Sequence, residues 1–164
     1  MNKILFSLIS IVALSVSALS AQATKTYCNN RFGFCVTYPA ELKVSDELPA
    51  NSDGVTLEAP NGIQTSVSGS YNVMNWTPEE ILEYTREDLE AVIGSSANAL
   101  ESETTGSGFE ALLASGTYYQ YVQMQSKGDI YLVLTVTGPE ELMEEMKALR
   151  GQLKLSFDHT EGGR

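Results

Sequence analysis

The sequence predicts an α+β domain in which an antiparallel sheet of about six or seven strands carries two main helices. Apolar and polar residues alternate in several short runs, as they do in strands with one buried face. Turn residues separate these runs by only a few positions, which is too short for the crossover that parallel strands need. Two other stretches, residues 78–93 and 140–150, repeat their apolar residues at helical spacing instead.

The first 23 residues predict a secretory signal peptide. Lys3 supplies a positive charge, residues 4–19 form an apolar run with interspersed serines, and Ala21-Gln22-Ala23 has the small residues that signal peptidase inspects. We expect cleavage after Ala23 and a periplasmic or secreted location. No later stretch approaches the roughly 18 apolar residues that span a bilayer, so no membrane insertion is expected after cleavage.

Residues 24–158 are expected to form a single domain, followed by a flexible tail at residues 159–164. The formal net charge is -11, and loss of Lys3 with the signal peptide makes it more negative. Such a surface repels phosphate backbones and anionic lipids, so we expect neither nucleic-acid binding nor membrane-surface binding. Basic partners or divalent cations would suit this charge, which a requirement for solubility would also explain.

The domain is expected to begin with a β-hairpin that holds both cysteines. A short strand around Tyr27 leads through an Asn-Asn-Arg turn to a strand at residues 34–38, which Pro39 ends. Cys28 and Cys35 can then lie opposite each other, and a disulfide between them would contribute roughly 2 to 3 kcal/mol. The C-x6-C spacing matches neither a redox C-x-x-C motif nor a zinc site. Unpaired cysteines, an intermolecular pair and, last, catalysis are the alternatives.

A second hairpin is predicted around Asn61-Gly62, with strands at residues 55–60 and 63–71. Asn-Gly between alternating runs is typical of tight hairpins, because both turn positions take positive φ. The loop before this hairpin contains Asn51-Ser52-Asp53-Gly54, which offers oxygen ligands without the spacing of a calcium loop. We interpret it as a turn.

The first helix begins with a capping box, in which Thr77 caps the N-terminus, Pro78 occupies the first turn and Glu80 reaches back. Gly94 ends it. The charged face, which carries glutamates and Arg86, is expected to point to water, and its carboxylates are not expected to be catalytic. The expected buried face consists of Ile81, Thr85, Leu89 and Val92, with Leu82 and Ile93 beside it.

The second half of the chain predicts an antiparallel meander, with strands at residues 99–104, 109–115, 117–125 and 130–137. Both faces of the last strand are apolar, so helices are expected on one or both sides of the sheet. Gly151 is expected to end the second helix, and residues 153–157 read as a final short strand. The buried stripe of that helix is expected to be Leu142, Met143, Met146 and Leu149.

This order of elements resembles the PsbP-like family, which includes bacterial envelope proteins of the DcrB type. The resemblance rests on F-G-F-x-x-x-Y-P at residues 32–39 and on the terminal Ser156-Phe157, and it covers nearly all of the mature chain. It implies an α/β/α sandwich around a central antiparallel sheet. The fold hosts unrelated roles, in photosystem II subunits, a nuclear-transport factor and secretion chaperones, so it assigns no function. The export signal disfavours the nuclear and cytosolic roles.

The sequence offers no catalytic constellation. His159, the one histidine, lies in the expected tail, so a Ser-His-Asp triad or a Cys-His pair would depend on a mobile residue. Neither a P-loop nor a G-x-G-x-x-G motif occurs. We therefore predict a protein that is not an enzyme and that uses no cofactor or metal.

The candidate interaction surface lies on the strand at residues 117–125, where alternation places Tyr119, Tyr121 and Gln123 on one face. Such side chains form adaptable contact surfaces. The alternative is that the tyrosines lie under a helix with their hydroxyls at its rim. Trp76 is either a second exposed anchor or a staple that fixes the helix entry.

The function predicted from these observations is an exported, non-enzymatic binding or assembly module that docks a protein partner in the bacterial cell envelope. The alternative is a periplasmic protein that binds a small ligand or a divalent cation through acidic groups such as Asp53 and Glu58.

Overall fold

The computed structural model describes residues 23–46 and 51–157. The predicted signal peptide, apart from Ala23, and the predicted tail lie outside the described residues. None of the helices in the described part is long and apolar enough to cross a membrane. The elements are β1 (Thr24–Asn29), β2 (Phe34–Pro39), β3 (Lys43–Val44), β4 (Gly54–Glu58), β5 (Gln64–Tyr71), α1 (Pro78–Ile93), β6 (Ala97–Thr105), β7 (Gly108–Ser115), β8 (Tyr118–Lys127), β9 (Ile130–Pro139), the 3-10 helix η1 (Glu140–Leu142), α2 (Met143–Gln152) and β10 (Lys154–Ser156).

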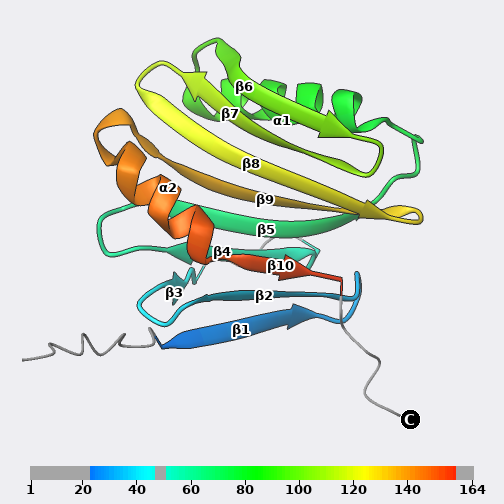
Figure 1. Ribbon diagram of the computed structural model, residues 1–164, viewed down its shortest axis with the longest axis horizontal. Helices are drawn as coiled ribbons and strands as arrows, with labels where there is room; N and C mark the ends of the chain where they lie inside the picture. Colours follow the sequence, from blue (N-terminus) through cyan, green and yellow to red (C-terminus); the bar gives the residue numbers. More distant parts are fainter. Residues whose placement is uncertain (1–22, 47–50, 158–164) are drawn as a thin grey trace, which may run out of the picture.

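The strands form two antiparallel sheets (Figure 1). The large sheet has seven strands in the order β3-β4-β5-β9-β8-β7-β6, and the small sheet has the order β1-β2-β10. The predicted meander is confirmed, since β6 to β9 follow one another as neighbours. The small sheet was not predicted as a separate unit, because alternation alone cannot show that β10 pairs with β2.

Helix α1 covers one face of the large sheet, which we call the α1 face. Ile81 and Leu89 of α1 pack there against Phe109, Leu113 and Val122, and all five are buried. On the opposite face, the α2 face, the buried residues come from α2, the small sheet and the neighbouring strands; they include Met146, Leu149, Phe34, Val36, Leu132, Leu134 and Val136. The predicted three-layer sandwich is therefore confirmed.

The two helices are offset across the large sheet, as Figure 1 shows. Helix α1 packs on β6 and β7, whereas α2 packs on β9 and β8. The small sheet shares its core with β4 and β5. Within the described residues, β6 and β7 therefore lie outside the main packing of α2 on the α2 face, and β4 and β5 lie outside the main packing of α1 on the α1 face.

The predicted ends of α1 are confirmed, but one residue of its expected buried face is wrong. Thr77 and Glu80 form the capping box, and Gly94 ends the helix at φ 76°. Val92 is 74% exposed. The cause is that the strands beneath this last turn carry serine, threonine and glutamine rather than apolar residues.

The second helix departs from its predicted end. Gly151 lies inside α2, which continues to Gln152, and Leu153 ends it in an extended conformation. An exposed helical glycine costs about 1 kcal/mol relative to alanine but does not by itself stop a helix. Of the expected stripe, Met146 and Leu149 are buried, whereas Leu142 and Met143 are half-buried.

The hairpin at Asn61-Gly62 is confirmed, but its turn differs from the predicted one. The N–H of Ala59 donates to the carbonyl oxygen of Ile63 at 2.9 Å, which leaves a three-residue loop. Only Gly62 of that loop has positive φ, at 89°. The cause is Pro60, whose ring fixes a negative φ and places the turn one residue earlier.

The N-terminal hairpin is fastened to the large sheet by the turn between its strands. Cys28 pairs with Cys35 across the hairpin, and a disulfide joins them with their Cα atoms 4.1 Å apart. The buried Asn29 amide donates to the carbonyl of Ser52 at 3.0 Å, and its Oδ1 accepts from the N–H of Phe32 at 3.1 Å. Phe32 then packs over Gly69 of β5.

Candidate functional site

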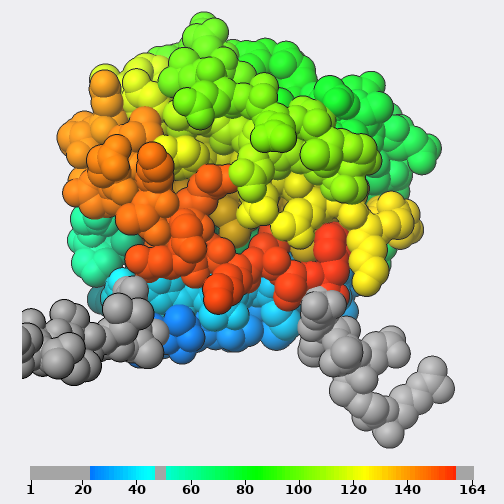
Figure 2. All heavy atoms as spheres, viewed as in Figure 1, coloured from blue at the N-terminus to red at the C-terminus, as the bar shows by residue number. Residues whose placement is uncertain are grey.

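The α2 face of the large sheet holds a groove over β6 and β7. Figure 2 shows this face, with β8 at the surface between α2 and β10 on one side and β6 and β7 on the other. Two adjoining cavities of about 430 and 290 Å³ make up the groove, and they share Glu103 and Glu110. The other lining residues include Glu101, Ser102, Thr105, Ser107, Leu112, Tyr121, Gln123, Gln125, Arg150 and Phe157.

Strand β6 forms one side of the groove and one edge of the large sheet, whose other edge is β3. It pairs with β7 on one side, and within the described residues no strand pairs with its other side. A register shift lies between Ala99 and Glu101, which marks a bulge. Most of β6 is exposed. Exposed edges of this kind accept an added strand unless charge or a bulge opposes it.

Arg150 of α2 forms the opposite side. Its guanidinium makes an ion pair with Glu110 and lies over the Tyr121 ring, with its carbon 5.7 Å from the ring centroid. Further along, Lys127 lies over the ring of Phe157 at 5.9 Å. Each contact places a cation on an aromatic face, which is attractive because of the ring quadrupole.

The groove is acidic overall. Glu101, Glu103 and Glu110 line it, and Arg150 is paired with the last of these. No ion pair engages Glu101 or Glu103 among residues 23–46 and 51–157. Two exposed carboxylates therefore remain beside the open edge of β6.

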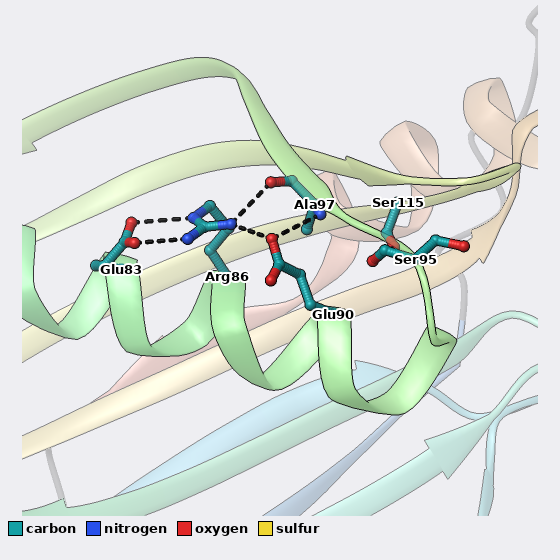
Figure 3. Close-up of polar contacts among 6 residues, drawn as sticks. All are labelled: Glu83, Arg86, Glu90, Ser95, Ala97 and Ser115. Atoms are coloured by element: carbon teal, nitrogen blue, oxygen red, sulfur yellow. Dashed lines mark hydrogen bonds and ion pairs between the residues drawn. The ribbon is translucent and has the colours of Figure 1, made fainter.

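Helix α1 closes the start of this edge with a polar network (Figure 3). The N–H of Ala97 donates to Glu90 Oε1 at 2.9 Å, and Arg86 donates to the Ala97 carbonyl at 3.0 Å. These two side chains thus occupy the hydrogen-bonding positions that a neighbouring strand would use. Arg86 also pairs with both Glu83 and Glu90, and these hydrogen bonds raise the pKa of Arg86 above its already high ordinary value.

Sequence reasoning missed this network because it assigned the whole charged face of α1 to solvent. The signal for it was the spacing of Glu83, Arg86 and Glu90, which places a cation between two carboxylates on one helix face. The network reaches Ala97 because of the way α1 crosses β6. No local sequence pattern shows this crossing.

The predicted interaction residues do not all come together. Tyr121 and Gln123 line the groove, and Tyr119 lies half-buried on the same face, against the core under α2. Trp76 belongs to the other face, where it contacts the α1 core and lies against the Tyr84 ring in a tilted arrangement, with ring centroids 5.4 Å apart. The Asn72 side chain holds the backbone of Trp76 through two hydrogen bonds of 2.8 Å. Trp76 and the tyrosines therefore cannot form one surface.

The acidic groups considered for a cation are also far apart. Asp53 directly precedes β4 and Glu58 ends it, which separates them by about 16 Å along an extended strand. The described part of the chain contains no group of three or more His, Cys, Asp or Glu side chains placed to hold a metal. The carbonyls of Asn51 and Ser52 instead accept hydrogen bonds from Arg31 and Asn29 of the first hairpin.

The likeness to known proteins is a likeness of fold. No family model matches the chain, and no curated protein matches it either. The solution structure of cyanobacterial PsbP (CyanoP) from Synechocystis sp. PCC 6803 is similar with a TM-score of 0.59 and 12% identity, over 87% of this chain and 98% of that one. At this identity the comparison shows a PsbP-like fold and no more, so it supports the expected fold but not the DcrB type.

A crystal structure from Bacteroides thetaiotaomicron is also similar, with 13% identity over 85% of this chain and 50% of that one. Its TM-score of 0.44 is too low to support a shared fold.

Proposed function

We propose that this chain is an exported, non-enzymatic binding module of the bacterial cell envelope, which docks an extended basic segment of a protein partner along β6 and into the groove. The observation that carries the proposal is the juxtaposition of an open sheet edge with an acidic groove. The PsbP-like fold is compatible with it but does not select it.

Affinity would come from the backbone of β6. An extended segment that pairs with a sheet edge gains main-chain hydrogen bonds, and its side chains alternate between the two faces of the sheet. Every second side chain would then point over the α2 face. There it would meet Glu101 and Glu103, which line the groove and have no ion-pair partner in the described residues.

Charge determines what kind of segment fits. Lys or Arg at alternate positions would pair with Glu101 and Glu103, and an apolar side chain could contact Leu112 or Tyr121. A second copy of this chain is disfavoured at the same edge, because its own glutamates would face these like charges. Helix α1 blocks Ala97, so pairing would begin beyond that residue.

The test is affinity capture from envelope extract with three versions of the tagged mature protein. The wild type is compared with Glu101→Lys/Glu103→Lys in the groove and with Glu79→Lys/Glu87→Lys on α1. Both pairs are exposed and change the net charge equally, but only the first lies at the groove. Purified partner is then titrated against isotope-labelled protein to locate its contacts by NMR.

The proposal requires a stoichiometric partner that the groove variant loses and the α1 variant keeps, with shifts centred on β6. Binding should also weaken as salt increases, because the contact is between exposed charges. Capture that is unaffected by reversing the groove charges would contradict the proposed site. Capture of no stoichiometric partner would contradict the binding function itself.

Export is tested separately by sequencing the N-terminus of the protein purified from its source. We expect the mature chain to begin at Thr24. A chain that retains residue 1 and remains in the cytosol would overturn the proposed location.

A further inference from the structure

The loop between β5 and α1, residues 72–77, holds the most exposed methionine of the described chain. Met74 is 66% exposed, whereas Met124 and Met146 are 2% and 0% exposed and Met143 is half-buried. We propose that Met74 is a site of reversible oxidation, at which a peroxide converts the thioether to a sulfoxide. This inference is independent of the proposed protein docking.

Methionine supplies the reduced sulfur of this domain. Both cysteines of the sequence are joined in the disulfide between Cys28 and Cys35, so neither offers a thiol. Thiolates are the strongest sulfur nucleophiles of proteins, and without them the thioethers are the sulfur that an oxidant meets first. An oxidant must reach the sulfur to react, so exposure decides the order among the methionines.

The backbone of the loop fixes the exposure of Met74. The N–H of Asn72 donates to the carbonyl of Asp129 at 2.7 Å, and the N–H of Asn75 donates to the carbonyl of Asn72 at 3.1 Å. The second bond closes a turn around Val73 and Met74, and Asn75 has a φ of 55°, which asparagine adopts more readily than most residues. Val73 is 80% exposed. The turn thus presents both apolar side chains to solvent.

The reaction needs no catalytic group of the protein. The sulfur lone pair attacks one oxygen of hydrogen peroxide, the O–O bond breaks as the S–O bond forms, and the other oxygen leaves as water after proton transfer. The sulfur loses two electrons, which the peroxide gains. A methionine sulfoxide reductase reverses the change with two electrons from a dithiol and releases the oxygen as water.

The fold should tolerate a sulfoxide at Met74 but not at the buried methionines. A sulfoxide is polar, and burying a polar group without a partner is unfavourable. Met124 belongs to the core on the α1 face and Met146 to the core on the α2 face, so oxidation there would disrupt packing. At Met74 the new oxygen faces water and changes only the polarity of the loop. This difference separates a reversible site from sites of damage.

The test is a time course of the folded mature protein with hydrogen peroxide as the probe, followed by peptide mapping with mass spectrometry. The rate of oxygen addition is measured separately at each methionine. We expect Met74 to react roughly tenfold or more faster than Met124 and Met146, with Met143 between them. In urea, where all four side chains are exposed, the four rates should converge, because the difference comes from the fold.

Matched variants test whether the fold tolerates a polar group at each position. Glutamine is unbranched like methionine but carries an amide at its end. Met74→Gln should leave the Tm unchanged, whereas Met146→Gln should lower it by about 5 °C or more, because the amide is buried in the core. Met74→Leu removes the exposed sulfur and should abolish the fast phase of oxidation without changing the rates at Met124 and Met146.

Reversal is tested on protein oxidised at Met74, with methionine sulfoxide reductases of both stereospecificities and a dithiol. The mass of the peptide should return to its unoxidised value, a readout that reduction of the disulfide does not affect.

The inference is overturned if Met74 reacts no faster than Met146 in the folded protein or if the reductases leave its sulfoxide in place. It is equally overturned if Met74→Gln and Met146→Gln lower the Tm alike. None of these results bears on the groove, because Met74 is not among its lining residues.

Discussion

Arg86 was expected on a solvated helix face, but its side chain is engaged by other groups. It contacts two carboxylates and one backbone carbonyl at the same time. Its hydrogen bond to Glu83 lowers the pKa of that carboxyl, although Glu83 itself is exposed. Such a residue links a helix to a strand edge rather than only keeping the protein in solution.

Arg86→Gln should return the pKa of Glu83 toward its ordinary value of 4.5. Because the folded-state pKa is depressed, the pair stabilises the fold above that value and loses its effect as the pH falls through the folded-state pKa. The difference in stability between wild type and variant should therefore shrink in acid. NMR titration of the carboxyl groups measures the pKa of Glu83, and urea unfolding at several pH values measures the difference in stability. Glu87→Gln is the control. A pKa of Glu83 that does not change in Arg86→Gln would contradict this assignment.

The disulfide also acts at the scale of single residues. Replacing both Cys28 and Cys35 by serine should lower the free energy of unfolding by roughly 2 to 3 kcal/mol, because the short covalent loop no longer restricts the unfolded chain. Urea unfolding of oxidised, reduced and double-serine protein measures this effect. The reduced wild type should match the variant. Two titratable thiols in the unfolded, unreduced protein would show that the bond does not form.

Among the elements, β6 combines accessibility with protection against unwanted pairing. Its bulge and its two glutamates are features that keep exposed edges from joining each other. Glu101→Val/Glu103→Val should therefore increase self-association, because the edge becomes apolar and uncharged. Light scattering across a concentration series measures this, and Glu87→Val on α1 is the control for added surface hydrophobicity. Equal behaviour of the two proteins would mean that β6 is not the reactive edge.

Elements were predictable from sequence where the information is local. The capping box at Thr77 and Glu80, the alternation along β9 and the pairing of Cys28 with Cys35 all depend on neighbouring residues. The exposure of Val92 was not predictable, since it depends on which half of the sheet lies beneath α1. For the same reason sequence could nominate Tyr121 and Gln123 but could not place Glu103 and Arg150 beside them.

At the scale of the whole molecule, the two sheets are coupled by a close contact. A Cβ atom at Gly69 would lie 2.6 Å from the Phe32 side chain, so glycine is required there for the hairpin turn to dock. Phe32 also packs on Tyr71, with ring centroids 5.2 Å apart. The large and small sheets should therefore unfold together.

Gly69→Ala should lower the free energy of unfolding by about 1 to 3 kcal/mol through overpacking. Combining it with Phe32→Leu should cost less than the sum of the two single changes, because the smaller side chain relieves the clash. Gly151→Ala is the control, since no atom lies within 4 Å of its added Cβ and helix propensity favours it. Chemical unfolding is measured for the wild type, the two single variants, the double variant and the control, and strict additivity would contradict the proposed contact.

The order of the small sheet has a consequence for how the chain matures. Strand β2 lies between β1, its neighbour in sequence, and β10, the last strand in the described part of the chain. The sheet therefore cannot be completed until nearly the whole domain has been synthesised. Long-range pairing of this kind slows folding. For a protein proposed to leave the cytoplasm, this delay would keep the first hairpin without its third strand, and so easier to unfold for passage through a narrow channel, until the last strand has been made.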